Sequence, residues 1–248
     1  MTKRILLGML TPSSNTALEP ITSAMVQDVP EVSAHFSRFR VTEISLSDRA
    51  LQQFDLQPIL DAAKLLADAK VDVIAWNGTA AGWLGFEADV ELCRQIQATT
   101  GIPATTSILA LNEIFETTGV KTFGLVTPYR QDVQQRIIKN YQQQGFECVA
   151  ERHLDLQVNF SFSEVSPSDI ADMIRDVAAT SPQAITTFCT NLRAAPLVQQ
   201  LEQSTGIPIY DTISVVVWKS LKLAGADPSH VKNWGQLFQM DTLSPQLR

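Results

Sequence analysis

The sequence predicts an α/β protein of two pseudo-symmetric lobes, each a mainly parallel sheet flanked by helices, with a ligand site in the cleft between them. Three observations lead to this prediction. Strand-like and helix-like segments alternate along the chain, short motifs recur in the same order in both halves, and the 248 residues suffice for one large domain or two small ones.

The first half contains three short apolar runs that predict buried strands, at residues 4–10, 34–41 and 71–76. Between and after them, apolar residues recur with helical spacing. This pattern predicts helices at residues 15–27, 56–69, 87–100 and 108–118, with Ser13 or Ser14 as a plausible cap for the first.

The second half repeats this alternation. Strands are predicted at residues 122–127, 148–153, 184–188 and 208–210. Helices are predicted at residues 130–144, 168–179, 194–204 and 214–223. Because strands alternate with helices, the sheets are expected to be parallel, with helices on both faces.

Three motifs indicate an internal duplication. The Thr-Pro that ends the first strand recurs at an offset of 128 − 12 = 116, the turn at Gly78 matches the turn at Cys189 with an offset of 111, and Thr-Gly-Ile-Pro recurs after 206 − 101 = 105 residues. We therefore predict an N-terminal lobe of residues 1–118 and a C-terminal lobe of residues 119–248, with the helix at 212–225 packing back on the first lobe. Ligands of open α/β sheets bind at the carboxyl ends of the strands, so Gly78 and Cys189 should face each other across one ligand.

Composition excludes several classes of protein. A formal net charge of −7 and a pI near 5.0 argue against a nucleic-acid partner. No apolar stretch is long enough to cross a membrane, and the N-terminus does not read as a signal peptide, so we expect a cytoplasmic protein. The oligomeric state is left open, a homo-oligomer included.

No cofactor or metal site is predicted. The three cysteines and three histidines show no metal-ligand spacing, and structural disulfides are not expected in a reducing compartment. The glycine-containing turn at residues 78–82 lacks one glycine of the dinucleotide-binding pattern.

The most reactive candidate is Cys189, which follows a strand and precedes a predicted helix. A helix N-terminus is expected to lower the pKa of this thiol. Asn15 and Tyr129 also follow strand ends. As neutral donors they suit a small carboxylate, although ordinary helix capping explains Asn15 as well.

These motifs resemble those of the aspartate/glutamate racemase superfamily, and within it the maleate cis-trans isomerase and arylmalonate decarboxylase branch. The resemblance runs nearly end to end. It rests on the stretches 11–16, 127–129, 189–191 and 234–238 and on the turn at Gly78 and Thr79. It implies two pseudo-symmetric lobes with a cofactor-free site between them.

The resemblance also implies roles for individual residues. In racemases and isomerases of the superfamily two cysteines flank the substrate, and the first would fall at Gly78, whereas decarboxylases are similar to this chain in having glycine there. A decarboxylase-like oxyanion pocket would use Thr79, Tyr129 and the backbone of Thr190.

An isomerase-like loop would hold a substrate carboxylate with Asn15. Ala80 and Asn191, in the two matched turns, complete the implied substrate-binding set.

A single thiol favours decarboxylation of a malonate-type dicarboxylic acid, because one acid is sufficient to protonate an enediolate. Two alternatives stay open. One is a racemase or cis-trans isomerase of a small carboxylic acid whose second group is not cysteine, and the other is a non-catalytic carboxylate-binding protein. An apolar patch that includes Trp76 or Trp83 is expected to destabilise the leaving carboxylate. On this reasoning, a cysteine introduced at Gly78 should create racemase activity.

Overall fold

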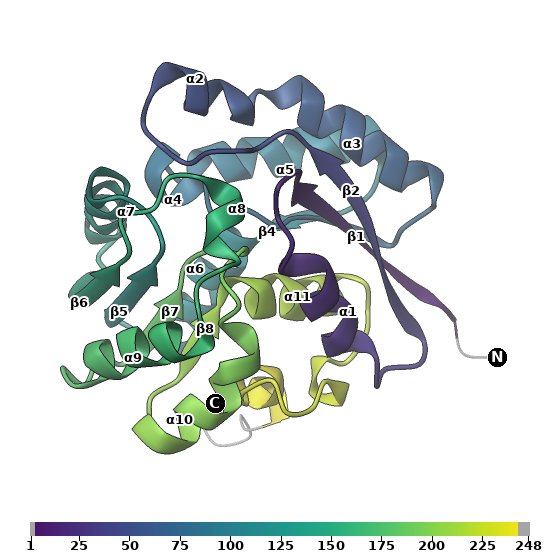
Figure 1. Cartoon of the computed structure of the whole chain (residues 1–248). Helices are drawn as coiled ribbons and strands as arrows, with labels where there is room; N and C mark the ends of the chain where they lie inside the picture. Colours follow the sequence, from purple (N-terminus) through teal and green to yellow (C-terminus); the bar gives the residue numbers. More distant parts are fainter. Residues whose placement is uncertain (1–2, 243–248) are drawn as a thin grey trace.

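The computed structural model describes residues 3–242 and contains two four-stranded parallel sheets (Figure 1). The first sheet has the order β2-β1-β3-β4, with β1 at Ile5–Pro12, β2 at Val32–Phe39, β3 at Val73–Trp76 and β4 at Ala104–Thr106. The second has the order β6-β5-β7-β8, with β5 at Thr122–Thr127, β6 at Glu147–His153, β7 at Ala184–Thr187 and β8 at Ile209–Asp211. The predicted fold class is confirmed.

Helices flank both sheets, as the alternation predicts. In the first half they are α1 (Leu18–Val26), α2 (Asp48–Leu51), η1 (Gln52–Phe54), α3 (Leu56–Asp68), α4 (Ala81–Leu84), α5 (Glu87–Thr100) and α6 (Ser107–Thr118). In the second half they are α7 (Gln131–Gln143), α8 (Asn159–Phe162), α9 (Pro167–Ala178), η2 (Ala195–Leu197), α10 (Val198–Thr205), α11 (Thr212–Leu223), η3 (Pro228–His230) and η4 (Gln236–Thr242).

The two halves correspond element by element. The central strand β3 matches β7 with an offset of 184 − 73 = 111, and α6 matches α11 with an offset of 212 − 107 = 105. The pairing of neighbouring strands is also the same in both sheets. Trp76 pairs with Thr106 in the first sheet, and the equivalent Thr187 pairs with Asp211 in the second. The carboxyl ends of β3 and β7 therefore lie at equivalent edges of two similar sheets.

Several local features differ from the sequence prediction. The short helices α2, α4 and α8 were not predicted, and neither was strand β4, because Ala104-Thr105-Thr106 contains no large apolar residue. Helix α1 begins at Leu18 rather than at residue 15, since the Asn15 side chain accepts hydrogen bonds from the N–H groups of Ala17 and Leu18. The helix expected from residue 194 is first a 3₁₀ turn that contains Pro196, and α10 begins only at Val198.

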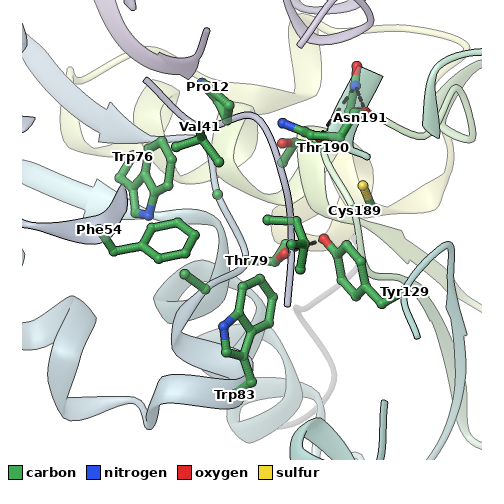
Figure 2. Close-up of a pocket in the computed structure, with 14 residues that line it drawn as sticks. Pro12, Val41, Phe54, Trp76, Thr79, Trp83, Tyr129, Cys189, Thr190 and Asn191 are labelled. Atoms are coloured by element: carbon green, nitrogen blue, oxygen red, sulfur yellow. Dashed lines mark hydrogen bonds between the residues drawn. The ribbon is translucent and has the colours of Figure 1, made fainter. Parts of the chain in front are cut away.

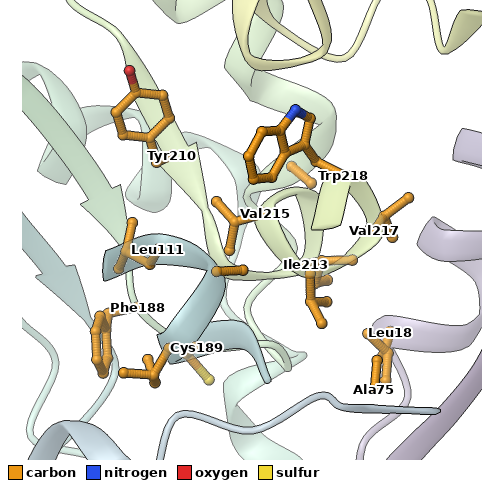
Figure 3. Close-up of a cluster of buried hydrophobic side chains, with 14 of the residues drawn as sticks. Leu18, Ala75, Leu111, Phe188, Cys189, Tyr210, Ile213, Val215, Val217 and Trp218 are labelled. Carbon is orange, nitrogen blue, oxygen red and sulfur yellow. The ribbon is translucent and has the colours of Figure 1, made fainter. Parts of the chain in front are cut away.

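Helices α6 and α11 each pack on the opposite half of the molecule. Helix α11, buried along most of its length, contacts α1, β3 and β4 of the first half as well as α6. Figure 3 shows Ile213 and Val217 of this helix facing Leu18 and Ala75. On α6, the ring of Phe115 lies 5.5 Å from that of Phe123 in the second sheet. The hydrophobic core therefore runs through the junction of the two sheets.

Among residues 3–242, no helix has both the length and the apolar composition to cross a membrane.

Candidate active site

Turns that follow strands of both sheets meet around one small cavity (Figure 2). The space that the centre of a water molecule can reach in it is only about 20 Å³, little more than one water needs. Its lining comes from the strand-end turns, the segment after β2 and the start of α8, and comprises Pro12, Val41, Ile44, Phe54, Trp76, Gly78, Thr79, Ala80, Trp83, Tyr129, Asn159, Cys189, Thr190 and Asn191.

The Cys189 thiol lies two residues beyond β7 and is 3% exposed. It is hydrogen-bonded to the Tyr129 hydroxyl and accepts hydrogen bonds from the backbone N–H groups of Asn191 and Leu192. Burial nevertheless dominates and raises the pKa of Cys189 to about 12. The expected lowering of this pKa is wrong, because no regular helix begins directly after the thiol and because burial penalises the thiolate more than the N–H groups stabilise it. Near neutral pH Cys189 is therefore a protonated thiol.

A chain of hydroxyl groups leads away from this thiol. The Tyr129 hydroxyl lies 2.7 Å from Oγ1 of Thr79, and either oxygen can be the donor. Burial raises the pKa of Tyr129 well above its ordinary value, so the phenol stays neutral and able to donate. Thr79, Tyr129 and Cys189 thus form one connected row along the cavity.

Backbone donors add to this row. Within the described part of the chain, no group accepts a hydrogen bond from the N–H of Thr79, Ala80 or Thr190, all of which line the cavity. Buried backbone N–H groups are nearly always paired in native proteins. These donors are therefore available to an anionic ligand.

The position opposite Cys189 is filled by an indole ring. A Cβ atom on Gly78 would lie only 2.0 Å from Cζ2 and 2.3 Å from Cε2 of Trp76. The φ angle of Gly78 is not positive, so backbone conformation does not require glycine at this position. Glycine is required there because the Trp76 ring approaches so closely. The side of the cavity that faces Cys189 consequently carries no acid or base.

Asn15 lies outside the cavity lining, at the junction of the two halves. Its amide nitrogen donates to the backbone oxygen of Thr190 at 3.0 Å and to Oγ1 of the same residue at 3.3 Å. Oδ1 of Asn191 in turn accepts the N–H of Thr16 at 3.0 Å. Asn15 and Asn191 thus tie the first turn to the thiol turn, and the contact of Asn15 with a substrate carboxylate stays a prediction.

Thr190 also belongs to this junction, because its hydroxyl donates to the backbone oxygen of Asn77 at 2.9 Å. The loop that holds Gly78 and the loop that holds Cys189 are thereby fixed relative to each other.

The remaining wall is apolar. The sequence predicts Trp76 or Trp83 on this patch, and both line the cavity together with Phe54, Val41 and Ile44. In Figure 2 Phe54 and Trp76 lie across the cavity from Tyr129 and Cys189, whereas Trp83 packs beside Tyr129, with the two ring centroids 5.4 Å apart.

Sequence reasoning missed four lining residues, Val41, Ile44, Phe54 and Asn159. They come from the segment after β2, from η1 and from the start of α8, which carry no strand-end motif. These segments meet through hydrogen bonds from Ile44 N to Gln157 O and from Asn159 N to Thr42 O. Nothing in the local sequence signals that pairing.

The cavity carries little titratable chemistry. Only Cys189 and Tyr129 among the lining residues can lose a proton, and no lysine, arginine or histidine lines the space. Across residues 3–242, no cluster of three or more histidine, cysteine, aspartate or glutamate side chains is arranged to hold a metal ion.

Comparisons with known proteins agree with this fold. A maleate isomerase of Geobacillus stearothermophilus is 25% identical over 96% of this chain and 98% of its own length. The arylmalonate decarboxylase of Bordetella bronchiseptica is 20% identical over 94% of this chain and 95% of its own length. The solved structure of the Nocardia farcinica maleate cis-trans isomerase bound to TRIS superimposes with a TM-score of 0.86 at 22% identity, covering 96% of this chain and 99% of that one.

The sequence model that describes arylmalonate decarboxylases matches residues 8–238, which include every residue of the cavity and all of both sheets except the first three residues of β1. This chain is therefore a member of the arylmalonate decarboxylase family.

Proposed function

We propose that the protein is a cofactor-independent decarboxylase of 2-substituted malonates, with Cys189 as the proton donor. The observation that carries the proposal is the asymmetry of the cavity. A thiol stands on one side, while on the other the indole of Trp76 occupies the space that any side chain at position 78 would need. A reaction with one proton transfer from one face fits this arrangement.

The proposed reaction has two steps. The bond between C2 and the leaving carboxyl carbon breaks, carbon dioxide departs, and the electron pair remains as an enediolate. Cys189 then transfers its proton to C2, and the resulting thiolate regains a proton from solvent. Thr79, Tyr129 and the N–H of Thr190 would stabilise the negative oxygens, as oxyanion donors do in acyl transfer.

The protonation state of Cys189 supports the role of an acid. A thiol whose pKa is about 12 is ionised to only about one part in 10⁵ at pH 7. Such a group is a poor nucleophile, but it can protonate the far more basic carbon of an enediolate.

The apolar wall supports the loss of a carboxylate. A dianionic malonate would place one carboxylate against the hydroxyl row and the other against Phe54, Val41 and Ile44, where no cation balances its charge. An uncompensated charge in apolar surroundings is costly. The cost disappears when the carboxylate leaves as neutral carbon dioxide.

Cis-trans isomerisation is the second candidate, favoured by the comparisons. Several relatives are named maleate isomerase, and one related solved structure is described as a maleate cis-trans isomerase mutant with a covalently bound succinylcysteine intermediate. For this chain, that route would require Cys189 to attack as a thiolate.

Incubation in deuterated water tests the alternatives. We expect carbon dioxide from methylmalonate or phenylmalonate and a product that carries one deuterium at C2 in a single configuration. Conversion of maleate to fumarate without decarboxylation of either malonate would refute the proposal in favour of the isomerase. Deuterium exchange into a 2-substituted acid without carbon dioxide release would instead indicate a racemase, and no turnover of any of these acids would leave carboxylate binding alone.

A further inference from the structure

A second cavity adjoins the candidate active site. Water centres can reach about 190 Å³ of it, compared with about 20 Å³ in the first. Phe54, Trp76 and Ala80 line both spaces, so they form the partition between them. The rest of the second wall is mostly apolar and comes from α3, α4 and α5.

One buried carboxyl group lies in this apolar wall. Asp89 of α5 is 3% exposed, and one of its oxygens accepts a hydrogen bond from the hydroxyl of Thr106. Within the described residues its other oxygen has no donor, and no lysine, arginine or histidine pairs with it. Arg94 forms an exposed ion pair with Glu91 at the same cavity and not with Asp89.

A charged carboxyl group that is buried without a cationic partner is unfavourable for folding. Burial raises the pKa of Asp89 to about 7, and the bond from Thr106 only partly offsets this. A buried carboxyl group that lines a cavity beside the candidate active site is suited to hold a ligand.

We propose that this second cavity receives the C2 substituent of the substrate, and that the preferred substituent is an aryl-sized apolar group ending in an ammonium that pairs with Asp89. This inference rests on the proposed function, since it assigns the substrate of the same site. The apolar walls contact the aryl ring of the substituent. The Asp89 oxygen that does not bind Thr106 accepts a hydrogen bond from the ammonium at the end of the substituent.

The partition explains how one ligand would occupy both spaces. The first cavity has room for little more than one water molecule, so any dicarboxylate must displace part of its lining. Phe54 is half-buried, belongs to the short η1 turn, and touches both spaces. Movement of this ring would join the cavities and connect the reacting carbon with Asp89.

Two malonates of equal size test the assignment. They are 4-(aminomethyl)phenylmalonate and 4-ethylphenylmalonate, which differ only in exchanging an ammonium for a methyl group. We expect the wild-type protein to favour the ammonium compound by about 10–100-fold in kcat/KM, the range of a hydrogen bond to a charged group. Asp89→Asn, whose amide oxygen still accepts from Thr106, should reduce this preference to within about 3-fold, while Asp68→Asn on the exposed face of α3 should keep it.

A filling variant tests the cavity itself. Leu92→Phe adds bulk to its wall and should lower kcat/KM for both aryl compounds relative to methylmalonate, whereas the same change at Leu65, which is 65% exposed, should not. Equal kcat/KM of the two aryl compounds for the wild-type protein, or an ammonium preference that survives Asp89→Asn, would overturn the assignment.

Binding measurements separate this inference from the proposed function. Calorimetric titration of both compounds into Cys189→Ser protein requires no turnover. If the wild-type protein decarboxylates neither compound, but Cys189→Ser binds the ammonium compound more tightly and loses this preference with Asp89→Asn, the decarboxylase proposal fails and the cavity assignment stands. Equal binding of both compounds would reject the cavity assignment even if decarboxylation occurs.

Discussion

A cysteine placed at position 78 provides the sharpest test of how this site limits its chemistry. The sequence alone leads one to expect racemase activity from Gly78→Cys, because a second thiol would then stand opposite the first. The structure corrects this expectation. The new Cβ would lie 2.0 Å from Trp76 Cζ2, whereas carbon atoms in contact are about 3.5–4.0 Å apart. The ring would have to retreat by about 1.5 Å.

The expected result follows from that overlap. Overpacking of this kind costs about 1–3 kcal/mol, so Gly78→Cys should lower the midpoint of urea unfolding and should not racemise a 2-arylpropionate. Trp76→Leu/Gly78→Cys makes room for the thiol. In a double-mutant cycle the two changes should therefore be less destabilising together than the sum of the single variants, by about the same 1–3 kcal/mol.

Racemisation is measured as loss of optical rotation and as deuterium exchange at C2. We expect it only in the double variant, and it should disappear when Cys189→Ser is added. A Gly78→Cys protein that unfolds at the wild-type urea concentration would show that the ring does not occupy this space. Racemase activity in that single variant would likewise refute the argument that Trp76 closes the second face.

Three further predictions concern other groups. Cys189→Ala should abolish carbon dioxide release without a change in the far-ultraviolet circular dichroism, whereas Cys93→Ala should keep activity; turnover at the wild-type rate by the first variant would reject the proton-donor role. Thr79→Ala and Tyr129→Phe should each lower kcat by about 10²–10³, as loss of an oxyanion donor does, and an unchanged kcat in both would reassign the oxyanion site. Because the pKa of Asp89 rises from 3.8 to about 7 on folding, the native state binds this proton more tightly than the unfolded chain. The stabilisation from this proton is therefore complete below pH 4 and lost by about pH 7. Asp89→Asn should accordingly be more stable than wild type above pH 7, by up to about 4 kcal/mol, with the difference shrinking towards pH 4; thermal unfolding at both pH values measures this, and a pH-independent difference would contradict it.

The fold was largely predictable because the same order of motifs, strands and helices occurs in both halves of the sequence. Thr-Gly-Ile-Pro recurs at residues 100–103 and 205–208, and each copy precedes a matching strand and helix. Strand β4 was not predicted because Ala104-Thr105-Thr106 lacks large apolar residues, whereas the equally short β8 contains Ile209 and Tyr210 and was predicted.

The polar half of the site was predictable from strand ends, whereas its apolar half was not. Cys189, Tyr129 and Thr79 each follow a strand, and parallel strands bring their carboxyl ends to one edge. Phe54 belongs to no such turn and reaches the cavity only through tertiary packing.

Two properties of the site depend on three-dimensional surroundings alone. The pKa of Cys189 depends on how deeply the thiol is buried, and the closed face depends on where the Trp76 ring lies. The residues next to Cys189 and Trp76 in the sequence determine neither the depth of the thiol nor the position of the ring.

The crossed packing of α6 and α11 bears on how the chain acquires its structure. Each helix completes the core of the half to which it does not belong by sequence, so a fragment ending at residue 118 would leave Phe115 without its partners across the junction. Neither half should then be an independent folding unit, and chemical denaturation should show a single cooperative transition.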